Sequence, residues 1–324
     1  MSQAKFKVAG LSLNHGDKTQ ICAILNVTPD SFSDGSLWFK PDDAIKHARD
    51  LVEAGATILD IGGESTRPGS TPVPVEEEIK RIVPVIQAIR EESNIPISVD
   101  TWKAEVADAA LEVGADIIND ITGFMGDPQM AAVVAKYEAG AILMFNPAVA
   151  RPEHKSAQNF PHFYSENPFS ESELKEFAQM PIMDLCKRYL ESSLRRAKEV
   201  GIPDDKILLD PGIGFALTKR ENLSLIKHLP ELYDFGYCIF LGVSRKRFIM
   251  NIAQEAGVNV DMDTEEGFAN RDLASAYLTA LAASQGIEVI RTHSVKEHVP
   301  AIAIGHAVFT ADEQEDISFG QYKK

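Results

Sequence analysis

The chain has few cysteines, a deficit of positive charge and no long apolar run. Its three cysteines, Cys22, Cys186 and Cys238, show no CxxC spacing, so they indicate neither a disulfide framework nor a zinc site and are typical of a cytoplasmic protein. The 32 Lys and Arg against 48 Asp and Glu give a net charge of −16, which disfavours a broad surface for nucleic acid or anionic membrane. No apolar run approaches the ~20 residues of a membrane helix, and the first residues lack a signal-peptide core, so we expect a soluble, unexported protein.

One sequence pattern recurs along the 324 residues: an amphipathic stretch, a glycine, and a short apolar run that ends in a polar residue. Glycine takes the left-handed position after a helix, and a continuous apolar run is typical of a strand buried on both faces. Each copy therefore predicts a helix followed by a buried strand. Clear copies start at Gly55, Gly114, Gly140 and Gly286, and looser copies start at Gly201 and Gly236.

Two further apolar runs, 21–27 and 97–100, bring the number of expected strands to eight. Eight strands alternating with helices predict a single-domain (βα)8 barrel, with a doubly wound open sheet as the alternative. We expect an N-terminal extension at 1–19, the barrel at 20–310 and a solvated tail at 311–324. Residues 147–180, rich in Pro, Ser, His and Phe, predict a long surface loop inserted after the fifth strand, and the acidic stretch 258–266 interrupts the seventh helical region.

Active sites of such barrels are built at the carboxyl ends of the strands. The residues that close the apolar runs are almost all polar: Asn26, Asp60, Asp100, Asn119, Asn146, Asp210, Ser244, and Arg291 with His293. Any one of them can cap the following helix, but together they favour one convergent site. Side chains alternate along a strand, so Asp100 shares a face with Ser98 and projects into the barrel mouth if the aliphatic face packs on the helices.

The chemistry of these side chains favours an anionic ligand that carries a nitrogen heterocycle. Carboxylates and amides such as Asp100 and Asn119 match adjacent N–H donors. The basic run 244–247 and the Arg291–His293 pair follow strands seven and eight, which is the usual phosphate corner of the fold. Loops 26–35 and 62–70, rich in turn-forming residues, predict a mobile lid that excludes water.

Five motifs resemble the dihydropteroate synthase family of folate biosynthesis. They are Asn26-Val-Thr-Pro-Asp-Ser-Phe-Ser-Asp-Gly35, Asp60-Ile-Gly-Gly-Glu-Ser-Thr-Arg-Pro-Gly69, Asp210-Pro-Gly-Ile-Gly-Phe215, Ser244-Arg-Lys246 and Arg291-Thr-His293. They follow one another in the family's order from about residue 20 to 305, and the family's (βα)8 barrel agrees with the strand count. The resemblance implies condensation of 6-hydroxymethyl-7,8-dihydropterin diphosphate with 4-aminobenzoate to give 7,8-dihydropteroate and diphosphate.

The resemblance also implies roles for single residues. Asp100, Asp210, Lys246, Arg291 and His293 would be catalytic. The pterin would be held by Asp100, Asn119, Met144, Asp210, Gly214, Phe215 and Lys246, and the diphosphate by Asn26, Arg291 and His293. Aminobenzoate would contact Phe32, Ser33, Asp34, Thr66, Arg67, Pro68, Lys246 and Arg247. Asn26 would bind Mg²⁺, and a homodimer through the last helices is expected.

The resemblance also implies a reaction mechanism, and the chain differs from the family at two positions. An aromatic amine is already nucleophilic, so the hard step is departure of diphosphate, which Mg²⁺, Arg291 and His293 would stabilise while Asp100 and Asp210 favour a cationic pterin methylene. We therefore expect a dissociative displacement. The chain departs from the family where Arg247 replaces a frequent Ser and where Phe145 replaces the usual His after Met144.

Three other functions agree with parts of the pattern. A pterin-binding methyltransferase barrel would keep the Asp and Asn residues but needs no cations for diphosphate. Lys246 could serve an aldolase as a Schiff-base lysine, although the neighbouring Arg245 and Arg247 suit anion binding better. A pterin- or phosphate-binding protein without catalysis is the third alternative.

Overall fold

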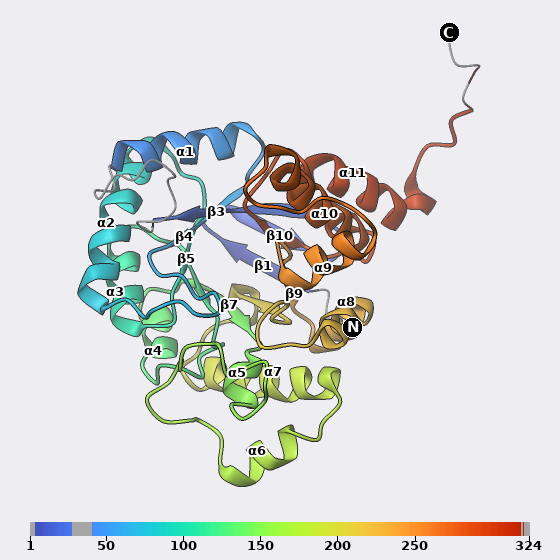
Figure 1. The fold of residues 1–324 in the computed structure, drawn as a ribbon. Helices are drawn as coiled ribbons and strands as arrows, with labels where there is room; N and C mark the ends of the chain where they lie inside the picture. Colours follow the sequence, from blue (N-terminus) through green and yellow to red (C-terminus); the bar gives the residue numbers. More distant parts are fainter. Residues whose placement is uncertain (1–3, 28–40, 319, 321–324) are drawn as a thin grey trace.

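The computed structural model describes residues 4–27, 41–318 and 320, and no helix within these ranges is long and apolar enough to cross a membrane. Eight parallel strands form a closed barrel in the order β10-β3-β4-β5-β6-β7-β8-β9 (Figure 1). Their bounds are β3 (Gln20–Asn26), β4 (Ile58–Gly62), β5 (Ile97–Asp100), β6 (Ile117–Asp120), β7 (Gly140–Met144), β8 (Ile207–Asp210), β9 (Cys238–Gly242) and β10 (Val289–Thr292). The predicted single-domain barrel is confirmed, and the open sheet is wrong.

Helices surround the barrel, and every barrel strand is followed by at least one helix (Figure 1). The long ones are α1 (Pro41–Glu53), α2 (Val75–Glu92), α3 (Ala104–Glu112), α4 (Met130–Lys136), α7 (Ile182–Glu199), α8 (Lys219–Lys227), α9 (Arg247–Glu255), α10 (Glu265–Ala283) and α11 (His298–Phe309). Short 3₁₀ turns are η1 (Asp204–Lys206), η2 (Leu229–Phe235) and η3 (Ala311–Glu313). Gly55 and Gly114 follow their helices with φ values of 114° and 107°, as the recurring sequence pattern predicts.

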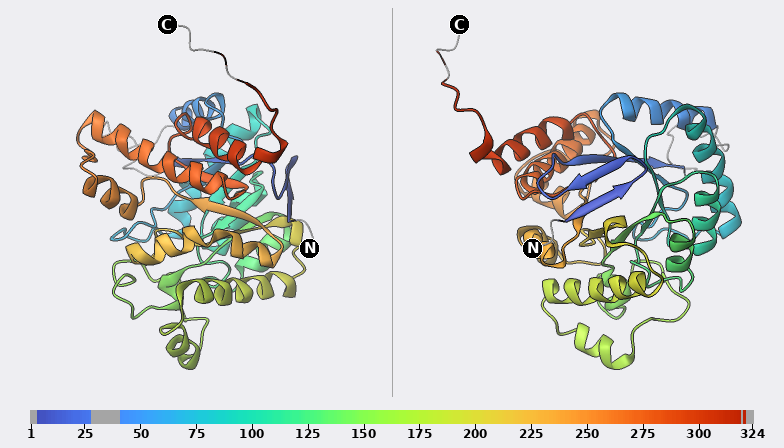
Figure 2. Two further views of the ribbon diagram at one scale, coloured as in Figure 1. Left: turned by 90° about the vertical axis from the view of Figure 1, so that its right-hand side faces the viewer. Right: turned by 180° about the vertical axis from the view of Figure 1, so that it is seen from behind.

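An antiparallel hairpin, β1 (Lys5–Val8) and β2 (Leu11–Asn14), precedes the barrel. Phe6 and Leu13 are buried against the inward-facing side chains of the strands, such as Ile117 and Leu208. Seen from behind, the dark-blue N-terminal strands cross the centre of the molecule (Figure 2, right). The segment expected as an extension thus completes the core at the amino ends of the strands, and the domain boundaries at 19 and 310 stay predictions.

The insertion 147–180 differs from the expected surface loop. It contains α5 (Pro147–Ala150) and α6 (Glu171–Phe177), and it projects at the bottom of Figure 1. Phe163, Phe169 and Phe177 are buried, and Phe169 packs on Phe177 with ring centroids 5.0 Å apart. Composition alone predicted solvent exposure, but these aromatic rings give the segment a core of its own joined to that of the barrel.

Alternation along the strands separates two faces, as the sequence predicts. Ile97 and Val99 of β5 pack outward with the helices, whereas Ser98 and Asp100 face the barrel interior. At the lower level the interior is filled by apolar residues such as Ile58 and Leu208. At the carboxyl ends of the strands the inward positions are polar, as at Asp100 and Asp210, so the barrel brings these polar side chains together.

Candidate active site

The floor of the barrel mouth is an ion triad. Arg291 of β10 donates from Nε to Asp60 Oδ2 (2.5 Å) and from Nη2 to Asp100 Oδ2 (2.7 Å). Asp60 is fully buried, and the Arg291 side chain is largely buried. Burial disfavours the charged guanidinium, but the two carboxylates outweigh this effect and keep the pKa of Arg291 above its ordinary value. Arg291 is therefore already paired with two carboxylates before any ligand binds.

Asn119 and Asp210 extend this floor to the neighbouring strands. Asn119 Nδ2 lies 3.3 and 3.4 Å from the two carboxylate oxygens of Asp60, so its amide oxygen is directed to accept from a ligand. Asp210 accepts a hydrogen bond from the Gly212 amide (2.7 Å) at its Oδ1. Because both residues close buried strands, their orientation is fixed by the barrel and not by a loop.

Two carboxylates of the floor are poised to accept protons. Burial, opposed by Arg291, raises the pKa of Asp100 from 3.8 to about 7. Burial likewise raises the pKa of Asp210 from 3.8 to about 6. Among the described residues, Asp100 Oδ1 is buried without a hydrogen-bond partner, which is costly unless a ligand donor reaches it.

Lys246 closes the site from the turn between β9 and α9. Its ammonium lies 4.7 Å from the centroid of the Phe215 ring, a cation–π distance. Gly214 permits this approach, because a Cβ there would come within 2.5 Å of Lys246 Cδ. Burial, opposed by Asp210, lowers the pKa of Lys246 from 10.5 to about 8. Lys246 thus faces Phe215 and lies near the carboxylates of Asp210 and Asp100.

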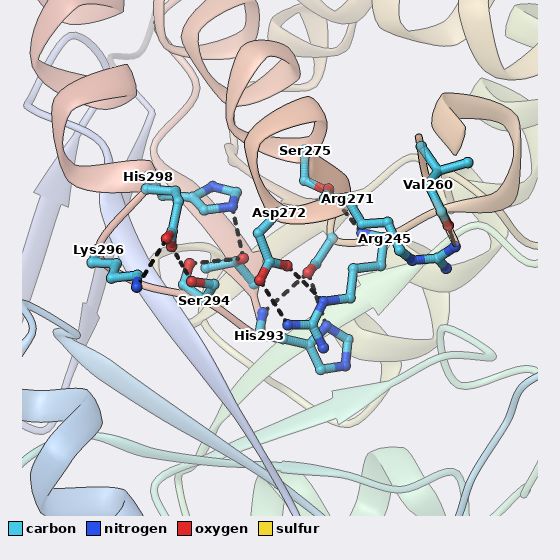
Figure 3. A network of polar contacts seen from close by, with 12 residues as sticks. Arg245, Val260, Arg271, Asp272, Ser275, His293, Ser294, Lys296 and His298 are labelled. Carbon is cyan, nitrogen blue, oxygen red and sulfur yellow. Dashed lines mark hydrogen bonds and ion pairs between the residues drawn. The ribbon is translucent and has the colours of Figure 1, made fainter. Parts of the chain in front are cut away.

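Arg245, which precedes Lys246, belongs to a network of polar contacts with α10 (Figure 3). Arg245 has a left-handed φ of 53°, and its guanidinium pairs with both oxygens of Asp272 in α10 (2.6 and 2.9 Å). Its amide donates to Ser275 Oγ (2.9 Å). Arg247 is exposed at the first residue of α9, and no polar contact within the described ranges ties it to the site. Arg245 therefore buttresses the Lys246 turn on α10, and the expected contact of Arg247 with aminobenzoate stays a prediction.

His293 lies between two polar neighbours at the end of β10. Its Nδ1 is 2.8 Å from Ser244 Oγ, and its Nε2 is 3.5 Å from Arg67 Nη2. Burial, together with Arg245 and other nearby cations, lowers the pKa of His293 well below 6.5. The imidazole is therefore neutral near pH 7 in this arrangement, with Nε2 accepting from Arg67, and the expected role of His293 at the diphosphate stays a prediction.

The loop after β4 is held by a buried ion cluster. Lys103 Nζ donates to Glu64, to Glu78 Oε2 (2.6 Å) and to the Val73 carbonyl (2.6 Å). Within this loop Thr66 is half-buried, and Arg67 and Pro68 are exposed. The loop that carries the expected aminobenzoate contacts is thus anchored at both ends, with Arg67 directed at His293.

The other predicted residues fall into three groups. Asn26 ends β3 beside Gly62, whose added Cβ would lie 3.8 Å from Asn26 Oδ1, and Met144 is buried at the top of β7. Asn146 is buried as the cap of α5 and accepts from the Ala148 amide (3.0 Å), so it does not join the convergent site. Phe32, Ser33 and Asp34 lie outside the described residues.

The departure at Phe145 does not alter the mouth. Phe145 is buried and meets Tyr189 of α7 edge-on, with centroids 5.4 Å apart. Its side chain belongs to the core between β7 and the helices.

The sequence placed Asp60 among the strand-end residues of the expected site but did not predict that it pairs with Arg291. Asp60 shares the inward face of β4 with Ile58, just as Asp100 shares that of β5 with Ser98, so alternation could have identified its inward direction. Phe160, whose ring lies 5.8 Å from that of Phe215, had no such signal, because it sits in an irregular segment.

Comparisons with known proteins agree with this geometry. The family model described as "Pterin binding enzyme" matches residues 22–293. The dihydropteroate synthase of Bacillus subtilis is 39% identical over 286 residues, which cover 88% of this chain and 87% of that protein. The Xanthomonas albilineans enzyme, solved with 4-aminobenzoic acid, superposes with a TM-score of 0.76 at 35% identity, covering 95% and 99% of the two chains. A structure of the same enzyme with 7,8-dihydropteroate gives 0.73 at 32% identity, covering 94% and 99%.

Proposed function

The chain belongs to the dihydropteroate synthase family, and from this we propose that it condenses 6-hydroxymethyl-7,8-dihydropterin diphosphate with 4-aminobenzoate to form 7,8-dihydropteroate and diphosphate. One observation carries the proposal most directly. The buried Asp100 Oδ1 has no partner among the described residues, and it lies in a floor of Asp and Asn side chains that suits the adjacent N–H donors of a pterin.

Two sets of residues would bind different parts of the pterin. Asp100, Asn119 and Asp210 would read its polar edge, while Met144, Gly214 and Phe215 would line its faces. Lys246 would reach the ring from the α9 side. Fixed polar groups of this kind cost no reorganisation during the reaction, which is why a barrel floor suits them better than a loop.

The reaction we propose breaks the bond between the pterin methylene carbon and the diphosphate oxygen before the new bond is complete. The bonding electrons leave with diphosphate, and the methylene becomes cationic. Asp100 and Asp210 would stabilise this cation. The amine of 4-aminobenzoate then supplies the electron pair for the C–N bond and loses its proton to solvent, so no protein nucleophile takes part.

We propose that the diphosphate lies between Asn26, Arg291 and His293. Arg291 holds two carboxylates through Nε and Nη2, which leaves Nη1 to donate to a phosphate oxygen. His293 would donate from Nε2 to the diphosphate only when its imidazole is protonated. The negative charge of a bound diphosphate raises the pKa of the imidazole and so favours this protonated form. Arg67, whose Nη2 lies 3.5 Å from His293 Nε2, and its neighbours Thr66 and Pro68 would close over the aminobenzoate.

Mg²⁺ is part of the same proposal. The amide oxygen of Asn26 is a hard donor of the kind Mg²⁺ prefers, and no cluster of three Asp, Glu, His or Cys side chains occurs in the described ranges. Mg²⁺ commonly relies on substrate phosphates and water for its remaining ligands, so a single protein oxygen fits. When bound, the ion would neutralise charge on the departing diphosphate.

A diphosphate-release assay tests the proposal. Purified protein should release diphosphate from the dihydropterin substrate when 4-aminobenzoate and Mg²⁺ are both present, and much less when either is left out. Formation of dihydropteroate in equal amount should accompany the release. No release with both substrates present would contradict the synthase function and favour a pterin-binding protein without this activity.

We further propose a cytoplasmic homodimer. All three cysteines are buried free thiols, which supports a reducing compartment. Helices α10 and α11 pack together on one side of the barrel and face the viewer in Figure 2, left. Their outer faces expose an apolar stripe formed by Leu273, Tyr277, Leu281, Ile304 and Val308. Such a contiguous stripe is typical of a protein interface.

Replacing Tyr277 with Glu should convert the dimer to a monomer. Tyr277 is 64% exposed at the middle of the stripe, so the fold tolerates the change, whereas a charge buried between two apolar helices opposes association. Light scattering after size-exclusion chromatography measures the result. Leu223→Glu, an exposed apolar residue on α8, is the matched control and should leave the mass unchanged. A dimeric Tyr277→Glu protein would place the interface elsewhere.

A further inference from the structure

Residues 151–163 of the insertion, here called the strap, contact the loops that follow strands β4, β5, β6 and β8. The strap starts at Arg151, which follows α5, and its Nη1 pairs with Glu221 Oε1 of α8 (2.7 Å) with both side chains largely buried. It ends at Phe163, which is buried. Both ends are therefore fixed to the barrel, and the strap is not a free surface loop.

Phe163 anchors the far end over two other loops. Its ring meets the edge of Trp102, in the loop after β5, with centroids 6.0 Å apart. Its carbonyl lies so near the loop after β6 that a Cβ on Gly126 would come within 2.4 Å of it. Close packing of this kind leaves the strap little freedom at this end.

Between these anchors the strap contacts both sides of the site. The carbonyl of Asn159 accepts a hydrogen bond from the Gly69 amide (2.8 Å), in the loop that carries Thr66, Arg67 and Pro68. The next residue, Phe160, packs its ring on Phe215 with centroids 5.8 Å apart and planes tilted by 33°. Phe215 in turn lies against the Lys246 ammonium.

Asn159 and Phe160, which are consecutive, thus link the loop that carries Thr66, Arg67 and Pro68 to Phe215. We propose that Phe160 is a positioning residue: by packing on Phe215 it fixes Asn159, and Asn159 holds the loop at Gly69 in the position that receives the aromatic amine. The kinetic consequence rests on the proposed synthase function, whereas the mechanical link rests on the contacts alone.

Hydrogen exchange tests the mechanical link on the full chain without substrates. Phe160→Ala should speed amide exchange in residues 65–72 by roughly 2- to 10-fold, the range that loss of one aromatic pair produces. Phe160→Tyr keeps the ring and should exchange as the wild type does. Phe235→Ala removes an equally half-buried ring from η2, at the amino end of β9, and should leave this loop unchanged. Unchanged exchange in Phe160→Ala, or an equal change in Phe235→Ala, would overturn the proposal.

Steady-state kinetics test the consequence. Phe160→Ala should raise KM for 4-aminobenzoate by a similar roughly 2- to 10-fold, with a smaller change in kcat and in KM for the dihydropterin substrate, and Phe160→Tyr should restore it. Equal changes in both KM values would show general loosening and contradict positioning. A wild-type protein that releases no diphosphate would refute the proposed function instead, and the exchange result would then still decide the role of the strap.

Discussion

Asp100→Asn is expected to lower kcat/KM about 100- to 1000-fold, the loss seen when one preorganised group is removed from a charge-stabilising site. The amide keeps the shape of the carboxyl group but brings no negative charge to the cationic methylene. It also offers one acceptor oxygen where the pterin edge requires two. The diphosphate-release assay under saturating Mg²⁺ measures the effect, and full turnover would refute the electrostatic role of Asp100.

The same variant should not lose stability at pH 8. The pKa of Asp100 is about 7 in the folded protein, above its ordinary 3.8, because burial penalises the charge. The folded state therefore binds the proton more tightly than the unfolded state. The stability this group contributes is fully present below pH 3.8 and is lost as pH rises through 7. Asn has no charge to desolvate, so this loss disappears.

Urea unfolding at pH 6 and pH 8 checks the sign. The wild type should lose more stability between these values than Asp100→Asn does, and the variant's midpoint at pH 8 should equal or exceed that of the wild type. Asp312→Asn, at an exposed position of η3, is the control and should change neither activity nor the pH dependence. A variant that unfolds early at pH 8 would mean that its inactivity comes from lost structure.

The barrel and most of its floor follow from local sequence rules. A glycine after each amphipathic stretch and an unbroken apolar run predict helix and buried strand, and alternation then turns Asp100 inward with Ser98. These rules need only a few consecutive residues. They also predict Asn119 and Asp210, because each lies near the carboxyl end of its strand, two residues after an inward apolar residue, Ile117 or Leu208.

What escaped prediction depends on residues far apart in the chain. Asp60 and Arg291 are 231 residues apart and meet because β10 closes the barrel against β3. Arg245 was expected at an anion, but Asp272 of α10 binds it, and only the packing of that helix decides this. Phe160 lies in a segment without periodicity, so its contact with Phe215 left no sequence pattern.

The second large effect concerns stability. Arg291→Met should lower the free energy of unfolding at pH 8 by ~3–5 kcal/mol, because it leaves the buried carboxylates of Asp60 and Asp100 without their cation. The decrease should be smaller at pH 6, where Asp100 takes up a proton in place of the lost charge. Urea unfolding monitored by circular dichroism measures both values.

A second substitution separates structure from chemistry in this triad. Adding Asp60→Asn to Arg291→Met removes the fully buried charge that the first change left unpaired, so the double variant should regain most of the lost stability. It should remain inactive, since the guanidinium that we propose to bind the diphosphate is still missing. A double variant as unstable as Arg291→Met would show that Asp60 is not the charge that Arg291 compensates. A stable, fully active one would remove Arg291 from the reaction and leave it a role in folding alone.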